Sequence, residues 1–271
     1  MTTLALRDDA FRRIASMMYD TVGIAFGETK RHLVSSRLAP RLQRLGIGSY
    51  EDYVSLITGD PQGDEMQVAI DLLTTNETYF FREPAHFELL ERELTARRPR
   101  SVEVWSAACS FGDEAFSIAM LLDDLQRTGH VGETWSVLGT DVSDRVLRRA
   151  SAAVFPEERL KAVSRERLRR HCERGEGESA GLVRIAGPLR DRVRFGWTNL
   201  CRQVDTLGPF DVDFLRNVLI YFDPQTKHEV VDRVVSRLRP GGLFFVGTAE
   251  GRVPSSLRLE PLAPGAFRRP A

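Results

Sequence analysis

The sequence predicts an α/β fold with a mostly parallel central sheet. Residues 210–223 read FDVDFLRNVLIYFD, which predicts a short aromatic-rich strand with a polar end. This strand is followed by a helical pattern, the turn RPGG and a second apolar strand, LFFVGT, which is the order of a βαβ unit. Residues 102–122 and 135–150 repeat the order of strand, turn and helix. Ligands of open parallel sheets bind beyond the carboxyl ends of the strands, so the polar residues there are candidate site residues. For residues 210–223 alone, a capped strand end with Tyr221 packed on the core explains the pattern equally well.

The N-terminal part of the chain is predicted to be helical. Residues 29–50 contain no acidic residue, and their basic residues recur at helical spacing opposite an apolar stripe of Leu38, Leu42 and Leu45. The basic face comprises Lys30, Arg37, Arg41 and Arg44. It is either the solvated face of an amphipathic helix or a binding face for an acidic partner. Proline lacks an N–H and clashes with the preceding turn, so we expect a kink or a break at Pro40.

Two further helix candidates, EDYVSLI and MQVAIDLL, complete a helical domain that we place at residues 1–88, followed by a linker at residues 89–100. Residues 101–271 form the predicted sheet domain. Its strands are expected at residues 102–106, 135–141, 211–216 and 243–247, with a last pair near residues 257–270. A glycine-rich turn and two short β segments at residues 172–198 predict a small antiparallel insertion.

Two of the predicted strand ends suit a nucleoside ligand without a phosphate. The turn AACSFGDE has small residues that allow a ligand to approach the backbone, and Asp141 ends the next strand, where its carboxylate can accept hydrogen bonds from a ribose diol. The sequence contains neither GxGxxG nor GxxxxGK followed by Ser or Thr, and the carboxylates of Asp113 and Glu114 would repel a phosphate. A nucleoside with a cationic sulfur, S-adenosylmethionine, fits these features.

With these residues, the chain closely resembles the CheR family of chemotaxis methyltransferases, from about Phe11 to Phe267. The motifs that carry the resemblance are TTNETYFFRE (74–83), WSAACSFGDEAFSIAM (105–120), LGTDVS (138–143), VRFGWTNL (193–200), FLRNVLIYFD (214–223) and LRPGGLFFVGTAE (238–250). Six motifs in this order and spacing are a specific signal. The resemblance implies a class I methyltransferase, whose Rossmann-like, doubly wound sheet is mostly parallel, with an N-terminal all-helical domain and a small antiparallel β-subdomain.

The resemblance also implies the reaction. Such an enzyme transfers a methyl group from S-adenosylmethionine to glutamate carboxylates of chemoreceptors and releases S-adenosylhomocysteine. The expected cofactor-binding residues are Asn76, Thr78, Arg82, Glu114, Asp141, Asn199, Leu200, Arg216 and Asn217. Arg82 and Tyr221 are the expected catalytic residues, which orient the acceptor carboxylate and the methyl group. The alternatives are the same chemistry on another signalling protein and an S-adenosylmethionine-binding adaptor without catalysis.

Two contacts with the receptor follow from the same resemblance. The basic face of residues 29–50 is expected to meet the acidic methylation region. Gly175, Gly181 and Arg184 resemble the β-subdomain loop that docks on a pentapeptide at the receptor C-terminus, where an extended peptide can add as a strand. A flexible surface hairpin with a solvated Arg184 is the alternative for this loop.

The composition agrees with a cytoplasmic enzyme, and we expect this enzyme to act as a monomer. Its 38 basic and 38 acidic residues balance, which argues against a nucleic-acid-binding protein. The three cysteines are scattered without a CxxC pair, so we expect reduced thiols and no metal site. We also expect no membrane insertion, because the sequence has no signal-peptide core and no apolar run of about 18 residues.

Several positions depart from the family pattern. Phe111 replaces a small Thr or Ser and is expected to narrow the cofactor crevice, while Leu215 replaces a Cys before the Arg-Asn pair. TAE at residues 248–250 stands where HSE is usual. Asp213 falls within a strand that should be buried, where an unpaired charge is costly. We therefore expect a basic partner for Asp213 or a position nearer the surface.

Overall fold

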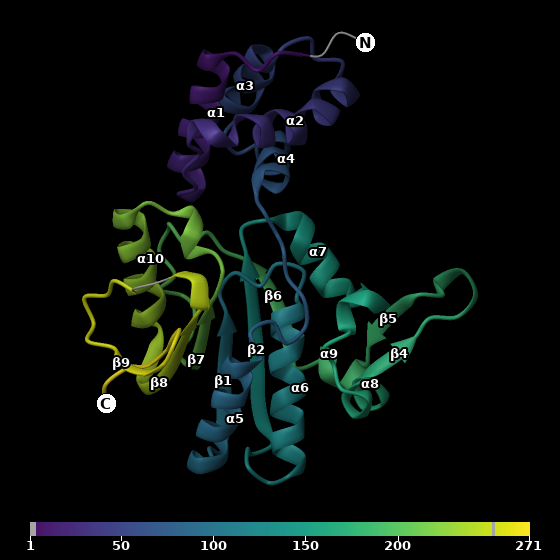
Figure 1. The fold of residues 1–271 in the computed structure, drawn as a ribbon, viewed down its shortest axis with the longest axis vertical. Coiled ribbons are helices and arrows are strands. Elements are labelled where there is room, and N and C mark those ends of the chain that lie inside the picture. Colours follow the sequence, from purple (N-terminus) through teal and green to yellow (C-terminus); the bar gives the residue numbers. More distant parts are fainter. Residues whose placement is uncertain (1–3, 251–252) are drawn as a thin grey trace.

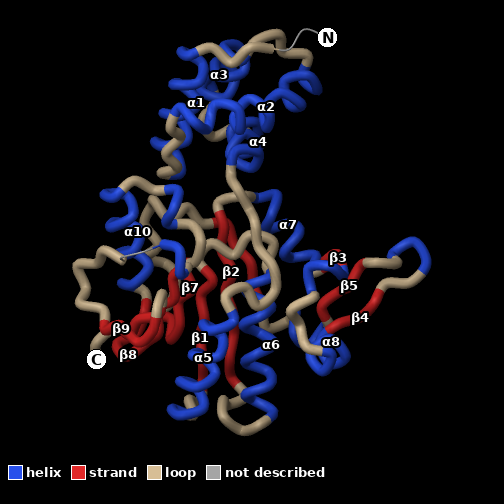
Figure 2. Tube along the Cα trace, viewed as in Figure 1, coloured by secondary structure: helices blue, strands red, loops and turns tan. Residues whose placement is uncertain are grey.

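The computed structural model describes residues 4–250 and 253–271 and centres on a seven-stranded sheet in the order β6-β2-β1-β7-β8-β10-β9 (Figures 1 and 2). Its five parallel strands are β1 (Ser101–Ser106), β2 (Thr134–Asp141), β6 (Val193–Trp197), β7 (Phe210–Leu215) and β8 (Leu238–Val246). An antiparallel pair, β9 (Glu260–Ala263) and β10 (Ala266–Arg268), extends one edge. The predicted mostly parallel α/β sheet is confirmed.

Helices cover both faces of this sheet because alternate residues of each strand point to opposite sides. Val104 and Phe214 share a core with α5 (Pro84–Arg97) and α6 (Asp113–Arg127). Trp105 and Leu215 share a second core with α10 (Pro224–Ser236). A further helix, α7 (Asp144–Ala152), packs on β2 and β6. Residues 89–100, predicted as a linker, mostly continue α5, whose apolar side chains are buried in the sheet core.

The N-terminal domain is helical, as predicted, and has a core of its own. Its helices are α1 (Asp8–Val22), α2 (Arg31–Leu45), α3 (Tyr50–Gly59) and α4 (Asp64–Leu73). The predicted stripe of α2 is buried at Leu38 and Leu42, whereas Leu45 is exposed. The helix runs through Pro40 without a break, since apolar side chains on both sides of the proline are fixed in the same core.

The insertion is a three-stranded antiparallel sheet that projects to one side of the molecule (Figure 1). Its order is β3 (Val154–Pro156), β5 (Leu182–Ile185) and β4 (Cys172–Arg174), with α8 (Arg165–His171) and α9 (Gly187–Arg190) beside it. The predicted bounds of 172–198 differ at both ends. The insertion takes in β3 well before residue 172, and residues 193–197 form β6, which pairs with β2 in the main sheet.

Asp213 lies on β7 with no exposed surface. Neither of its carboxylate oxygens has a hydrogen-bond partner among the described residues. Burial raises its pKa well above the usual range, which favours the neutral form of the side chain. The expectation of a basic partner or a more superficial position is therefore wrong, because the carboxyl group is fully buried and neither of its oxygens is bonded.

Candidate active site at the carboxyl edge of the sheet

A pocket of about 960 Å³, its open mouth included, lies between the carboxyl ends of the parallel strands and the N-terminal domain. Such a volume is typical of small-ligand sites. The pocket brings together every residue predicted to bind the cofactor, along with Tyr221: its lining includes Asn76, Thr78, Arg82, Glu114, Asp141, Asn199, Leu200, Arg216, Asn217 and Tyr221. The N-terminal domain contributes Val22 and Ile24 to the wall.

Asp141 ends β2 and is fixed by two backbone donors. Its Oδ2 accepts a hydrogen bond from the N–H of Ser110 at 2.9 Å, and its Oδ1 accepts one from the N–H of Ser143 at 3.0 Å. Ser143 in turn caps α7 by accepting a bond from the N–H of Val146. Burial raises the pKa of Asp141 to about 6. Each oxygen keeps a lone pair for a ligand that enters the pocket.

Arg216 follows β7 and contacts the protein's own acidic groups. Its Nη1 donates to Oε2 of Glu114 at 3.0 Å, and its Nη2 lies 3.6 Å from Oε2 of Glu83 and donates to the main-chain oxygen of Arg82. The other oxygen of Glu114 accepts a bond from the hydroxyl of Ser106 at 2.6 Å. The side chain of Arg216 is only 2% exposed. It therefore joins the carboxyl end of β7 to the segment before α5 and to the start of α6.

Two glutamates position the turn after β7, and neither was among the predicted site residues. Asn217 adopts a left-handed conformation (φ 59°) and donates to Oε1 of Glu83 at 3.2 Å. Glu250 is buried and accepts hydrogen bonds from the N–H groups of Leu219 and Gly247, each at 2.6 Å. Glu83 and Glu250 are the last residues of two family motifs, TTNETYFFRE and LRPGGLFFVGTAE. Their place in these motifs is the sequence feature that could have indicated a role near the site.

Burial has different outcomes for these carboxylates. Burial opposes ionisation of Glu83, but the N–H of Thr248 and the charge of Arg216 outweigh it and lower its pKa. For Glu114 and Glu250 burial dominates, and the pKa of each is raised. The acidic side chains that line the pocket are Glu77, Glu114 and Asp141, against the two guanidinium groups of Arg82 and Arg216. This excess of carboxylates suits a cationic ligand better than a phosphate.

Arg82 and Tyr221 are both half-buried at the pocket wall. The Nη1 of Arg82 donates to the main-chain oxygen of Glu77 at 2.8 Å, and its guanidinium lies 5.8 Å from the ring centroid of Tyr79. The main-chain oxygen of Tyr221 accepts a bond from the N–H of Ala25 at 3.1 Å. Arg82 is thus held by its side chain, whereas Tyr221 is held by its main chain.

The remaining predicted cofactor residues also make internal contacts. The side-chain amide of Asn199 donates to the main-chain oxygen of Thr21 at 2.6 Å and accepts from the N–H of Cys201, so it ties the sheet domain to α1. The amide of Asn76 donates to the hydroxyl of Thr74 at 3.2 Å. Thr78 accepts a bond at its main-chain oxygen from Arg159 at 3.1 Å. These contacts fix the segment that crosses the pocket between the domains.

The predicted basic face is partly used inside the N-terminal domain. Arg41 pairs with Glu65, which also accepts a bond from the hydroxyl of Tyr53 at 2.8 Å. Arg37 donates to the main-chain oxygens of residues 73 and 74 at the end of α4, at 2.9 and 3.0 Å. Lys30 and Arg44 are exposed. None of the four residues lines the pocket, and their binding role stays a prediction.

Phe111 is not among the residues that line the pocket, so the expected narrowing of the crevice is not found. The predicted tether residues lie away from the pocket on the insertion. Gly175 is in a tight turn, where a Cβ would lie 2.2 Å from the main-chain oxygen of Ser179, and Gly181 has φ 83°. Arg184 is exposed on the central strand β5, paired in register with Val154 and Glu173.

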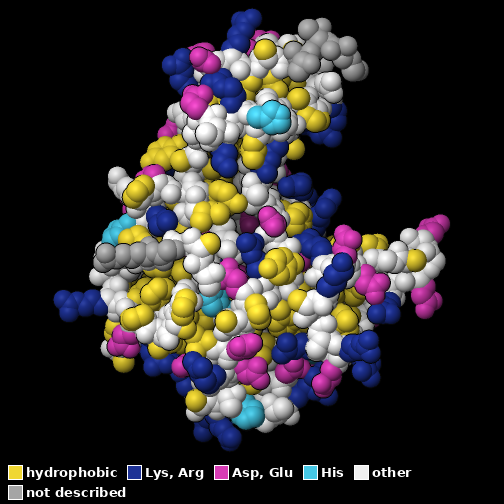
Figure 3. Space-filling model, viewed as in Figure 1, with side chains coloured by type: hydrophobic (Ala, Val, Ile, Leu, Met, Phe, Trp, Pro, Cys, Tyr) yellow, Lys and Arg dark blue, Asp and Glu magenta, His cyan; other side chains and the backbone are white. Residues whose placement is uncertain are grey.

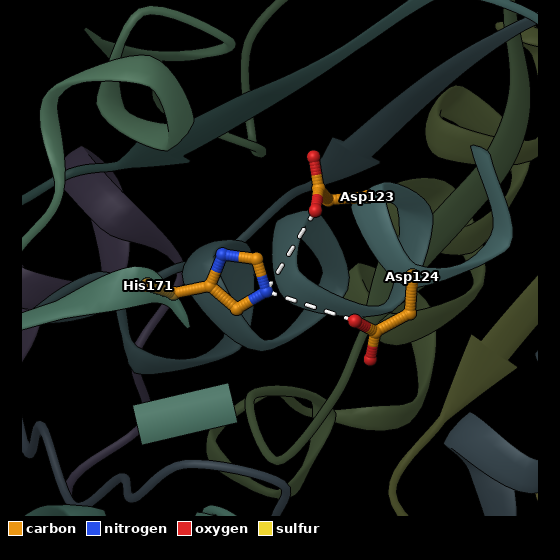
Figure 4. A group of neighbouring side chains, drawn as sticks. All are labelled: Asp123, Asp124 and His171. Carbon is orange, nitrogen blue, oxygen red and sulfur yellow. Dashed lines mark ion pairs between the residues drawn. The ribbon is translucent and has the colours of Figure 1, made fainter. Parts of the chain in front are cut away.

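A cluster of Asp123, Asp124 and His171 joins α6 to α8 (Figure 4). The Nε2 of His171 lies 3.8 Å from Asp123 and 3.7 Å from Asp124. These residues are distant in sequence, so spacing along the chain did not reveal the group. Arg167 and Arg170 also bind Asp124, and with His171 they outweigh burial and lower the pKa of Asp124 to about 2. We therefore assign an ion-pair cluster that attaches the insertion to α6.

Comparison with known proteins identifies both domains. Residues 9–74 match the all-alpha domain of CheR methyltransferases, and residues 76–260 match the SAM binding domain of CheR methyltransferases. The chain belongs to the CheR methyltransferase family. The family fold is therefore confirmed: a class I methyltransferase sheet with an N-terminal all-helical domain and a small antiparallel sheet.

Close relatives of this CheR-family chain are chemotaxis protein methyltransferases. That of Escherichia coli (strain K12) is 41% identical over 248 residues, which cover 91% of this chain and 86% of the relative. The Salmonella typhimurium protein is 40% identical over 248 residues, covering 91% and 85%. Chemotaxis protein methyltransferase 2 of Pseudomonas aeruginosa is 38% identical over 255 residues, covering 92% and 89%. Among the described residues, none of the helices of this chain has the length and apolar character needed to span a bilayer.

Proposed function

We propose that this CheR-family methyltransferase acts in the cytoplasm as a monomer and transfers a methyl group from S-adenosylmethionine to glutamate carboxylates of chemoreceptors. The observation that carries the proposal is the single pocket in which Asp141, Glu114, Arg82 and Tyr221 meet. S-adenosylhomocysteine is the product left in that pocket. The names of the relatives support a role in chemotaxis.

The residues present fit the cofactor. Asp141 keeps free lone pairs at the end of β2, where a ribose diol would donate to them, and the acidic wall formed with Glu114 suits a sulfonium. Asn76, Thr78, Asn199 and Leu200 shape the cavity, with Arg216 and Asn217 at the methionine end. When bound, S-adenosylmethionine supplies an activated methyl group on a positively charged sulfur.

The protein's own residues have little acid-base work to do. A glutamate side chain has a pKa of about 4.3, so the acceptor is already ionised at neutral pH and needs no general base. Placement remains, and well-oriented reactants gain roughly 7–11 kcal/mol from it. We assign this task to Arg82, which pairs with the acceptor carboxylate, and to Tyr221, which borders the methyl group.

The insertion offers a place for the receptor's C-terminal pentapeptide. Its sheet has two open edges, β3 and β4, to which an extended peptide can add as a strand. Arg184 projects from the exposed face between these edges beside the exposed side chains of Leu182 and Val154. It can pair with a carboxylate of the peptide, while Gly175 and Gly181 form the turns that shape the loop. Lys30, Arg37, Arg41 and Arg44 of the basic face are assigned to the methylation region.

The proposal is tested with methyl-labelled S-adenosylmethionine and a cytoplasmic receptor fragment. Base-labile label on the fragment, lost when its methylation glutamates are changed to alanine, is the expected result. Labelling of a different signalling protein in place of the receptor would support the second reading of the sequence. Cofactor binding without transfer to any acidic protein would leave only an adaptor.

A further inference from the structure

Three arginine side chains converge on the ring of Phe111. Their guanidinium carbons lie 4.9 Å (Arg159), 5.7 Å (Arg149) and 5.9 Å (Arg145) from the ring centroid. Arg145 and Arg149 are one helical turn apart on α7, and Arg148 lies between them on the exposed side. We call these five residues the Phe111 patch. Figure 3 shows basic side chains gathered where Figure 1 places α7.

The positive charge of the Phe111 patch is only partly balanced. Arg159 pairs with the buried Asp113 at 2.5 Å, and Arg145 donates to the main-chain oxygen of Asp71. Arg148 and Arg149 are exposed, and neither side chain has a hydrogen bond or ion pair within the described parts of the chain. Like charges this close repel one another. The attraction of each guanidinium group to the aromatic face helps to hold Arg145, Arg149 and Arg159 together.

The patch borders the mouth of the pocket. Phe111 directly follows Ser110, which lines the pocket, and Arg159 donates to the main-chain oxygen of Thr78, another lining residue. On the other side it approaches the basic face of α2. Burial lowers the pKa of Arg37, and the charge of nearby Arg145 lowers it further. Arg37 on α2 and Arg145 on α7 both donate to main-chain oxygens near the end of α4, so basic side chains extend from α2 to α7 beside the pocket wall.

We propose that the Phe111 patch binds an acidic segment of the protein substrate next to the glutamate that enters the pocket. The inference rests on the proposed function, which makes the substrate an acidic protein. Carboxylates of that segment would pair with Arg148 and Arg149 in the planar, forked geometry that guanidinium groups provide. Phe111 acts as the platform that keeps the guanidinium groups at the surface, which explains an aromatic residue at a position outside the pocket.

The test is the double charge reversal Arg148→Glu/Arg149→Glu, with methylation of the receptor fragment measured at several substrate and salt concentrations. We expect the KM for the fragment to rise at least about tenfold, because two favourable charge contacts become repulsive. Added salt should raise the KM of the wild type and lower that of the variant, since screening weakens attraction and repulsion alike. The affinity for S-adenosylmethionine and the melting temperature should stay unchanged.

The matched control is Arg165→Glu/Arg169→Glu, which makes the same change in net charge at two exposed positions on α8. A KM equal to that of the wild type is expected. If both double variants raise the KM equally, the effect is one of net charge and the assignment to the Phe111 patch is overturned. An unchanged KM in Arg148→Glu/Arg149→Glu also overturns it while leaving the proposed function intact. Absence of transfer by the wild type refutes the proposed function instead.

Discussion

Replacing Arg216 with alanine tests whether this residue binds the cofactor or holds the pocket together. The guanidinium lies between Glu83 and Glu114, and it also binds the main-chain oxygen of Arg82. Its removal leaves two carboxylates without their cation, in positions where their side chains are 18% and 13% exposed. The expected primary effect is therefore a loss of folding stability.

The magnitude follows from the burial of the three side chains. Removing one partner of a buried ion pair costs about 3–5 kcal/mol, because the remaining charge is stranded. Both carboxylates retain some solvent contact, so we take the lower end, about 3 kcal/mol. A loss of 1 kcal/mol lowers the melting temperature of a domain of this size by about 2–4 °C, so a fall of roughly 6–12 °C is expected.

The assay is thermal and urea unfolding, without cofactor, of the wild type and of Arg216→Ala. Glu83→Gln is measured in the same way, alone and combined with Arg216→Ala. The double variant Arg216→Ala/Glu83→Gln should be more stable than the sum of the single changes predicts, by at least about 1 kcal/mol, since it strands one carboxylate fewer. The reasoning is refuted if Arg216→Ala weakens cofactor binding while the unfolding free energy stays within about 0.5 kcal/mol of the wild type. Arg216 would then be a ligand and not an internal clamp.

Three further predictions concern the pocket. Glu250→Gln should lower the unfolding free energy by about 1–3 kcal/mol, because the NH₂ group of the glutamine would face a backbone N–H that the wild-type carboxylate accepts. An unchanged urea midpoint would contradict this prediction. The affinity for S-adenosylmethionine should fall below pH 6, by up to about tenfold per pH unit, because Asp141 must lose its proton to accept hydrogen bonds from the ribose and its pKa is raised to about 6. Calorimetry that shows the same affinity from pH 5 to 8, or the same affinity in Asp141→Ala, would exclude this role of Asp141. Arg82→Ala should reduce kcat by at least about tenfold with little change in melting temperature, and full turnover would remove Arg82 from the proposed catalytic residues.

The positions of the pocket residues were predictable because each follows a strand or belongs to a short motif. Strand ends at one edge of a parallel sheet meet in space, so Asp141 and Asn217 were expected together before any coordinates. Their partners were not predictable. The amide of Asn199 bonds to Thr21, far away along the chain, and the contacts of Arg216 join three separate segments. Hydrophobic periodicity predicts a helix or a strand, but it does not predict which side chains from other segments will contact it.

The bounds of the insertion show the same limit. Residues 182–185 and 193–197 carry similar short β patterns, and both were assigned to the insertion. The first pairs with β3 and β4, whereas the second pairs with β2 in the main sheet. A two-residue alternation predicts a strand and its faces, but it carries no information on which neighbour supplies the hydrogen bonds. Asp213 was misjudged for a related reason, since the raised pKa of a carboxyl group buried in a strand leaves no mark in the sequence.

The pocket wall is shared by two domains that have separate hydrophobic cores. A ligand that fills the pocket contacts both, so its binding and the docking of the N-terminal helices must strengthen each other by the same factor. The segment from Thr74 to Asn76, which passes from one domain to the other, should resist proteolysis most when the cofactor is abundant. Through this coupling, the docking of the N-terminal domain on the sheet domain would track the cell's supply of methyl donor.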